Sequence, residues 1–232
     1  MNLATSLDHW ILEALNGFAR KSWAFDQAVT ALADNDLVKG GVAVAALWWA
    51  WFEGREGAGR AHVIATILSC LAALAAGRHL VLTLPFRMRP IHDPQVGFVD
   101  PYGAAGTVVA KMSSFPSDHA VLFFALATGL CFVSRRAGIL AVLYTAIVVA
   151  LPRLYLGLHY FSDIVAGAVL GVAICWIGNL VLPRSRGVQR LLAVSMTRPA
   201  LFYPALFLVT FEIAELFGSA RALASGFFKL FK

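Results

Sequence analysis

Apolar residues fill six long stretches of the chain, and short polar linkers separate them. The stretches are approximately Leu37–Phe52, His62–Leu84, Ala120–Val133, Ala137–Leu151, Ile164–Leu182 and Pro199–Phe217. A membrane-spanning helix needs about 20 predominantly apolar residues. Only Ile164–Leu182 is uncharged and long enough to span by itself, because the other stretches are shorter or carry a charge near one end. We predict six spans nevertheless, since the linkers between the stretches alternate regularly in charge.

The first 36 residues follow a different pattern. Apolar residues recur there at helical spacing while charged residues occupy the other faces. The apolar set is Leu7, Trp10, Ile11, Leu15 and Phe18. This pattern predicts an amphipathic helix that either lies in the membrane interface or packs on the outer surface of the protein itself. We therefore divide the chain into an N-terminal amphipathic, interfacial segment, residues 1–36, and a six-span domain, residues 37–232.

The composition agrees with a membrane protein. Apolar residues make up 59% of the chain and charged residues 14%, whereas soluble domains contain about 25% charged residues. The three cysteines lie within apolar stretches without C-x-x-C spacing, so neither a disulfide framework nor a zinc site is predicted. Basic residues do not cluster with aromatic ones, which argues against a nucleic-acid partner. The predicted fold class is an all-α, polytopic membrane helix bundle with about six transmembrane helices.

The whole net charge of +6 falls in three short linkers, Glu53–Ala61, Ser134–Arg136 and Pro183–Arg198. They contain eight arginines and two glutamates, and the remaining charges cancel. The positive-inside rule places such linkers in the cytoplasm. The other two linkers, including the long Pro85–Asp118 segment, are then expected on the outer, periplasmic side of the plasma (inner) membrane.

Three polar clusters lie at the outward ends of the predicted spans. They are Arg87, Arg89 and Pro90 after the second span, Pro116 to His119 before the third, and Arg153 to Asp163 between the fourth and fifth. Arginines offer planar pairs of donors to phosphate oxygens, and amides at a helix N-terminus bind anions. Two histidines can divide the nucleophile and acid roles of phosphoryl transfer. His159 and Asp163 are four residues apart, so on a helical turn the carboxylate can fix the imidazole tautomer.

These clusters resemble the signature of the type 2 phosphatidic acid phosphatase family, which shares a core with the vanadium haloperoxidases. That signature consists of K-x6-R-P, P-S-G-H and S-R-x5-H-x3-D. The matching residues here are Arg89 and Pro90, then Pro116, Ser117 and His119, then Arg153, His159 and Asp163. By motif the resemblance covers about Arg78 to Asp163, and the six-span plan covers the rest.

The resemblance implies an integral membrane phosphatase for a lipid phosphate or prenyl pyrophosphate, and phosphatidic acid, phosphatidylglycerol phosphate and undecaprenyl pyrophosphate are all compatible. His159 would form a phosphohistidine, Asp163 would orient it, and His119 would protonate the leaving oxygen. The predicted phosphate-binding set is Arg89, Arg153, Ser117, Asp118 and Arg87. No metal ion and no other cofactor is implied. The expected partners are the lipid substrate and membrane lipid, and the oligomeric state is left open.

Three positions depart from the signature. Leu82 stands where the lysine is expected, and Arg87 or Arg78 is a candidate replacement, with Arg87 preferred because it lies outside the apolar stretch. Asp118 replaces the glycine, so it must point away from the phosphate, be protonated, or weaken phosphate binding. Pro152 replaces the serine of the third motif. Two alternatives to hydrolysis remain: phosphotransfer to a lipid or sugar hydroxyl, and a non-catalytic lipid-binding or scaffold protein with a degenerate site.

Overall fold

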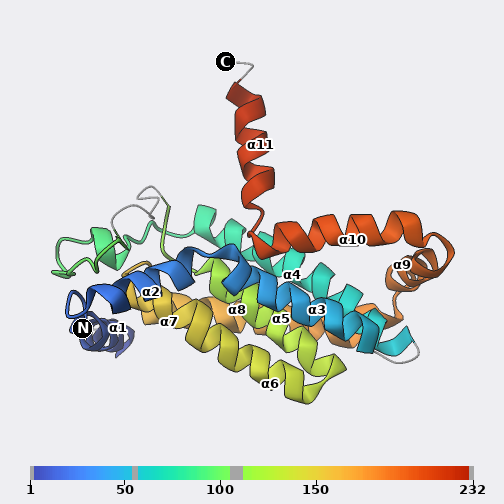
Figure 1. Cartoon of the computed structure of the whole chain (residues 1–232), viewed down its shortest axis with the longest axis horizontal. Helices are drawn as coiled ribbons and strands as arrows, with labels where there is room; N and C mark the ends of the chain where they lie inside the picture. The colour runs from blue at the N-terminus through green and yellow to red at the C-terminus, as the bar shows by residue number, and fades with distance from the viewer. Residues whose placement is uncertain (1–2, 54–56, 105–111, 230–232) are drawn as a thin grey trace.

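The computed structural model describes residues 3–53, 57–104 and 112–229. Within these ranges all regular secondary structure is helical (Figure 1), which confirms the predicted fold class. The helices before the long loop are α1 (Leu3–Asn16), α2 (Trp23–Asp34), the π-turn η1 (Leu37–Gly41), α3 (Val42–Glu53) and α4 (Ala58–Thr83), with η3 (Pro90–His92) inside the loop. Those after it are α5 (Asp118–Val133), α6 (Arg135–Tyr144), the π-turn η5 (Thr145–Ala150), α7 (Leu151–Tyr155), α8 (Phe161–Val181), η6 (Leu182–Arg184), α9 (Arg186–Thr197), α10 (Pro199–Ala214) and α11 (Gly218–Lys229).

All six predicted apolar stretches are helical, but they differ in length. Three continuous helices are long and apolar enough to cross a membrane: Ala58–Thr83, Arg135–Tyr155 and Phe161–Arg184. Helices α5 and α10 are apolar but have 16 residues each. At 1.5 Å per residue that is about 24 Å, against a hydrocarbon core about 30 Å thick. The chain is therefore a multi-pass membrane protein, and the count of six spans stays a prediction.

Helices α4, α5 and α8 pack against one another at the centre of the bundle. Glycines on α8 allow the close approach to α5: a Cβ added to Gly171 would lie 2.1 Å from the Val121 carbonyl oxygen, and one added to Gly167 would lie 2.7 Å from that of Ser117. Small residues at such contacts let helix backbones meet closely in membranes. This contact fixes the start of α5 beside the start of α8, where two of the three polar clusters lie.

Helix α1 packs on the protein's own surface, against α7 and α8. It buries Leu12 and, unexpectedly for an amphipathic helix, the carboxylate of Asp8, while Trp10 is exposed. These contacts correspond to the second of the two alternatives that the sequence left open. The division into segment 1–36 and domain 37–232 stays a prediction.

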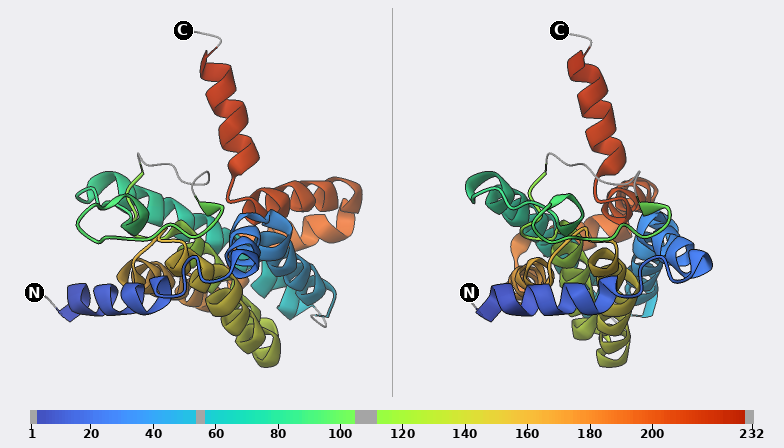
Figure 2. Two further views of the ribbon diagram at one scale, coloured as in Figure 1. Left: turned by 60° about the vertical axis from the view of Figure 1, so that its left-hand side comes forward. Right: turned by 90° about the vertical axis from the view of Figure 1, so that its left-hand side faces the viewer.

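The two ends of the bundle differ in chemistry. Helix α9 and the α5–α6 junction contain four of the eight linker arginines, and Arg184 and Arg198 flank α9, which lies at the right of Figure 1. Because α4 runs away from that end and α5 and α8 run back toward it, the three polar clusters meet at the opposite end. Helix α11 projects away from the bundle in all three views (Figures 1 and 2).

Candidate active site

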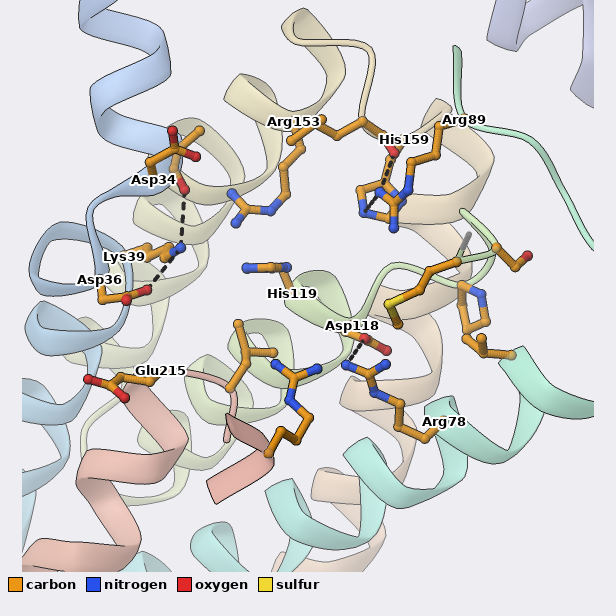
Figure 3. Close-up of a pocket in the computed structure, with 18 residues that line it drawn as sticks. Asp34, Asp36, Lys39, Arg78, Arg89, Asp118, His119, Arg153, His159 and Glu215 are labelled. Atoms are coloured by element: carbon orange, nitrogen blue, oxygen red, sulfur yellow. Dashed lines mark hydrogen bonds and ion pairs between the residues drawn. The ribbon is translucent and has the colours of Figure 1, made fainter. Parts of the chain in front are cut away.

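A cavity of about 280 Å³ lies at the end of the bundle opposite the basic linkers. Its charged and imidazole lining comes from several helices that are far apart in the sequence (Figure 3). These residues are Asp34, Asp36, Lys39, Arg78, Arg89, Asp118, His119, Arg153, His159, Glu215 and Arg221. Five of the predicted site residues are among them, so the fold brings the three polar clusters to one place.

His159 lies in the turn between α7 and α8. Gly157 opens this turn with φ of +63°, and a Cβ at that position would come 2.7 Å from the ring of Phe98. The imidazole is 5% exposed, and its Nδ1 lies 2.8 Å from the carbonyl oxygen of Ser114. Because a carbonyl oxygen only accepts, Nδ1 carries the proton and Nε2 keeps its lone pair. Nε2 lies 3.4 Å from Nη1 of Arg89.

The surroundings of His159 keep its imidazole neutral. Burial lowers the pKa of His159, Asp163 raises it in part, and the positive charges of Arg89 and Arg153 lower it again. The net direction is downward from the ordinary value, so the lone pair on Nε2 is available at pH 7. A nitrogen nucleophile needs that lone pair.

Asp163 is fully buried in the first turn of α8. Its Oδ2 accepts a hydrogen bond from the backbone N–H of Tyr160 at 2.8 Å and lies 3.6 Å from Nδ1 of His159. The expected pair of His159 and Asp163 is therefore present as a close contact. The hydrogen bond that fixes the tautomer, however, goes to the Ser114 backbone, a partner that no side-chain motif signals.

His119 faces the same cavity from the first turn of α5 (Figure 3). Its ring stacks on Phe123, with a centroid separation of 6.3 Å. Among the described residues, neither of its ring nitrogens has a hydrogen-bond partner. Both nitrogens are therefore free to exchange a proton with a bound ligand.

Arg89 and Arg153 supply cations without carboxylate partners. Arg153 is 3% exposed and donates to the Val149 carbonyl oxygen at 3.0 Å, and Arg89 donates to that of Leu158 at 2.7 Å. The buried Nε of Arg89 has no partner in the described part of the chain. Neither guanidinium forms an ion pair with a described carboxylate. Two such cations on one cavity favour a phosphate-like anion.

Asp118, the residue in place of the motif's glycine, forms an ion pair with Arg78 on the cavity wall (Figure 3). The Arg78 Nη2 to Asp118 Oδ2 distance is 2.7 Å. The pair offsets the repulsion that a bare carboxylate would exert on a phosphate. Leu82, at the position of the family's lysine, is 84% exposed and does not line the cavity. The geometry thus favours Arg78 over Arg87 as the replacement for that lysine.

Two residues of the predicted phosphate-binding set have other partners. The guanidinium of Arg87 binds the carboxylates of Asp8 and Asp163 and does not line the cavity. Ser117 is fully buried, and its Oγ accepts from the Ala120 backbone N–H at 3.5 Å as the N-cap of α5. Their predicted phosphate contacts stay predictions, but both side chains have structural tasks that the motifs did not reveal.

Six charged residues outside the matched motifs line the cavity, and besides Asp34, Asp36 and Arg78 they are Lys39, Glu215 and Arg221. Lys39 reaches it from η1, Glu215 from the end of α10, and Arg221 from α11. Lys39 is paired with Asp36 at 2.9 Å, whereas Arg221 forms no ion pair with a described carboxylate. The only signal in the sequence was that these charges stand at the ends of apolar stretches.

Apolar helices that end in a cavity with two histidines, and two arginines without described carboxylate partners, define a membrane protein with a cationic, histidine-containing cavity. Residues 67–186, just over half of the chain, match the model of the PAP2 superfamily. The chain therefore belongs to the PAP2 superfamily, which confirms the resemblance seen in the motifs.

Individual relatives match over shorter segments. The chain is 42% identical over 60 residues to the bacitracin transport permease protein BcrC of Bacillus licheniformis, which is 26% of this chain and 29% of that protein. It is 45% identical over 58 residues to the lipid A 4'-phosphatase of Bacteroides thetaiotaomicron, which is 25% of this chain and 26% of that protein. The matches thus span less than a third of the length of either relative. A crystal structure described as the first transmembrane PAP2 type phosphatidylglycerolphosphate phosphatase, from Bacillus subtilis, aligns with a TM-score of 0.48 and 19% identity over 80% of this chain and 90% of that one.

Proposed function

We propose that this protein is a metal-independent membrane phosphatase that hydrolyses a lipid phosphate or prenyl pyrophosphate through a phosphohistidine on His159. One observation carries the proposal: His159 keeps an unprotonated Nε2, 3.4 Å from Nη1 of Arg89, at a cavity that also holds a second histidine and two arginines without carboxylate partners. This combination provides a nucleophile, a proton donor and phosphate ligands together. Membership of the PAP2 superfamily supports the same reaction class.

The proposed reaction has two steps. Nε2 of His159 attacks phosphorus, and the bond to the lipid oxygen breaks as His119 gives that oxygen a proton. Water then attacks the phosphohistidine while His119 accepts a proton from the water, and the phosphorus–nitrogen bond breaks to release inorganic phosphate. Arg89 and Arg153 offset the charge on the other phosphoryl oxygens throughout.

A groove beside the cavity supports a lipid substrate. It has a volume of about 370 Å³ and shares Arg78, Leu216 and Arg221 with the cavity. Its remaining lining residues are Leu71, Leu74, Ala75 and Phe217. A substrate whose phosphate occupies the cavity has its hydrocarbon chain against this apolar wall, where burial is favourable.

The distribution of charge supports a site on the outer, periplasmic side of the plasma membrane. The cavity lies at the opposite end of the bundle from the basic linkers, which the positive-inside rule assigns to the cytoplasm. A reporter fused after Lys232 should lie on the outer, periplasmic side of the plasma membrane. A cytoplasmic reporter would contradict this orientation.

The deciding experiment is phosphate release by the purified protein in detergent. The panel contains phosphatidic acid, phosphatidylglycerol phosphate and a prenyl pyrophosphate, each with and without chelator, for the wild type and for His159→Ala. We expect chelator-resistant release that His159→Ala abolishes. Folded protein that binds these lipids without releasing phosphate would favour the scaffold alternative, and an acceptor-dependent phosphorylated product would favour phosphotransfer.

A further inference from the structure

Arg87 connects the N-terminal helix to the proposed nucleophile. Its Nη1 lies 2.5 Å from Oδ1 of Asp163, and its Nη2 lies 2.7 Å from Oδ2 of Asp8 on α1. The guanidinium also stacks over the ring of Tyr160, 4.2 Å from its centroid. A planar fork that joins two carboxylates in this way is a geometry that lysine cannot reproduce.

Asp8 is built into this cluster rather than exposed on an amphipathic helix. It is 3% exposed and receives three hydrogen bonds from two residues. The Ser162 backbone N–H donates to Oδ1 at 2.8 Å, and the Ser162 hydroxyl donates to Oδ2 at 2.6 Å. Arg87 supplies the third. A buried carboxylate is costly without such partners, so its retention on a surface helix calls for a reason.

Asp163 divides its two oxygens between the two sides of the site. Oδ1 faces Arg87, and Oδ2 lies 3.6 Å from Nδ1 of His159. A cation bound to Oδ1 draws carboxylate charge away from the imidazole. A second carboxylate behind that cation offsets this withdrawal. Negative and positive charges therefore alternate along the cluster, from Asp8 on α1 through Arg87 to Asp163, which lies beside His159.

We propose that Asp8 is a positioning residue which, through Arg87, sets how strongly the Asp163 carboxylate acts on His159. The proposal rests on the proposed function, in which His159 is the nucleophile. It makes α1 a part of the active site and gives Arg87 a role in place of direct phosphate binding. It also explains why the amphipathic pattern of α1 includes a buried aspartate.

The signs of the expected effects are opposite for the two partners. Removing the negative charge of Asp8 disfavours the protonated imidazole, so the titration of His159 should move to lower pH. Removing the positive charge of Arg87 favours the protonated imidazole, so the titration should move to higher pH. The other charged or titratable groups facing His159 are Arg89 from the long loop, Arg153 from α7, and Asp118 and His119 from α5. None of them lies on α1, and none changes in these variants.

The test measures the titration directly, without relying on turnover. Full-length protein in detergent is treated with diethyl pyrocarbonate, which modifies neutral imidazole, and the rate at His159 is followed by mass spectrometry across pH. For the wild type we expect a midpoint below the ordinary value for histidine. Asp8→Asn should lower that midpoint and Arg87→Gln should raise it. The matched control Glu13→Gln removes one negative charge from the exposed face of α1 and should leave it unchanged.

Phosphate release is measured in parallel on phosphatidic acid. The acidic limb of the kcat/KM profile should shift in the same directions as the modification midpoints. Arg87→Lys keeps the charge, so it should keep the wild-type midpoint while kcat falls by up to about 100-fold through lost orientation.

Midpoints that move in the same direction in Asp8→Asn and Arg87→Gln, or stay fixed, would overturn the proposal. If Asp8→Asn does not fold, Arg87→Gln decides alone: a modification midpoint that does not rise in this variant would overturn the proposal. Absence of phosphate release by the wild type would instead count against the proposed function, because the modification midpoints remain measurable.

Discussion

His159 is held through both of its ring nitrogens, whereas His119 contacts the described part of the protein mainly through the face of its ring. Nδ1 of His159 binds the Ser114 carbonyl and Nε2 lies near Arg89, while Asp163 stands behind the ring. His119 stacks on Phe123 and leaves both nitrogens to the cavity. The wall of the cavity that contains His159, which we call the rigid wall, therefore fixes its histidine more tightly than the opposite wall, around His119, fixes that residue.

This difference matches the tasks proposed for the two residues. A nucleophile gains from a fixed tautomer and a fixed direction of its lone pair, because in-line attack tolerates little error in geometry. A general acid that later acts as a base must release and regain a proton at two positions, so free nitrogens serve it better than permanent partners. The asymmetry thus supports the proposal that His159 attacks and His119 transfers protons.

Replacing the two histidines should give the largest effects and separate their roles. His159→Ala should lower kcat by about 10⁴- to 10⁶-fold, because the nucleophile is lost. His119→Ala should lower it by about 10²- to 10⁴-fold, the contribution of general acid–base catalysis. Rapid-quench assays with radiolabelled lipid phosphate should trap phosphohistidine in His119→Ala and never in His159→Ala. A trapped phosphoenzyme in His159→Ala would reverse the comparison.

Arg153 belongs to the rigid wall, and its replacement should have the next largest effect. Arg153→Lys keeps the charge but loses the planar fork, so kcat should fall by about 100-fold as the transition-state charge loses a fixed donor. The same exchange at the exposed Arg190 of α9, Arg190→Lys, serves as the control and should leave kcat unchanged. Steady-state kinetics with phosphatidic acid measure both. An unaltered kcat in Arg153→Lys would remove Arg153 from the phosphate site.

The sequence predicted which side chains form the rigid wall better than it predicted the groups that hold those side chains in place. Motif spacing brought His159, Asp163 and Arg153 together correctly, because four- and six-residue separations across one turn leave little freedom. It missed the Ser114 carbonyl, since any residue offers a backbone oxygen. It also did not reveal that Arg87 binds Asp8, because Asp8 lies 79 positions away and its local pattern is that of the polar face of a helix. The predicted phosphate contact of Arg87 stays a prediction. Long-range pairing of this kind leaves no local pattern.

The exposed position of Leu82 has a similar cause. It is one helical turn beyond Arg78, about 6 Å further along α4. Arg78 meets Asp118 at the first residue of α5, so the neighbouring helices end near that level. Helical periodicity predicts that Leu82 and Arg78 share one face of α4, but it does not predict where the neighbouring helices end along that face.

The Arg78–Asp118 pair belongs to the wall around His119, and we expect a smaller effect there. Arg78→Gln should raise KM by about tenfold, because a hydrogen bond to a charged group contributes roughly 1.5–3 kcal/mol and this side chain is partly exposed. Asp118→Asn should lower KM several-fold, since it removes a like charge and frees Arg78 for the phosphate. Kinetics at fixed ionic strength measure both. A higher KM in Asp118→Asn would mean that the aspartate holds Arg78 in place instead.

Ser117 anchors the start of α5, and its replacement should have the smallest effect on catalysis. Its Oγ accepts from the Ala120 N–H at 3.5 Å, and its own N–H donates to the Asp163 carbonyl oxygen at 3.2 Å, which ties the two walls together. Ser117→Ala loses only the cap and should lower the free energy of unfolding by about 1 kcal/mol. KM should be unchanged. Thermal unfolding in detergent and steady-state kinetics test the two parts.

The glycine variant at the same position distinguishes a cap from a phosphate ligand. Glycine is a tolerable N-cap, so Ser117→Gly should cost only a few tenths of a kcal/mol and unfold at a higher temperature than Ser117→Ala. If the hydroxyl binds phosphate instead, both variants lose it equally, and KM should rise by the same factor in each. The order of the two melting temperatures, read beside the two KM values, therefore tells whether the wall around His119 binds substrate through Ser117 or uses that residue only to begin its helix.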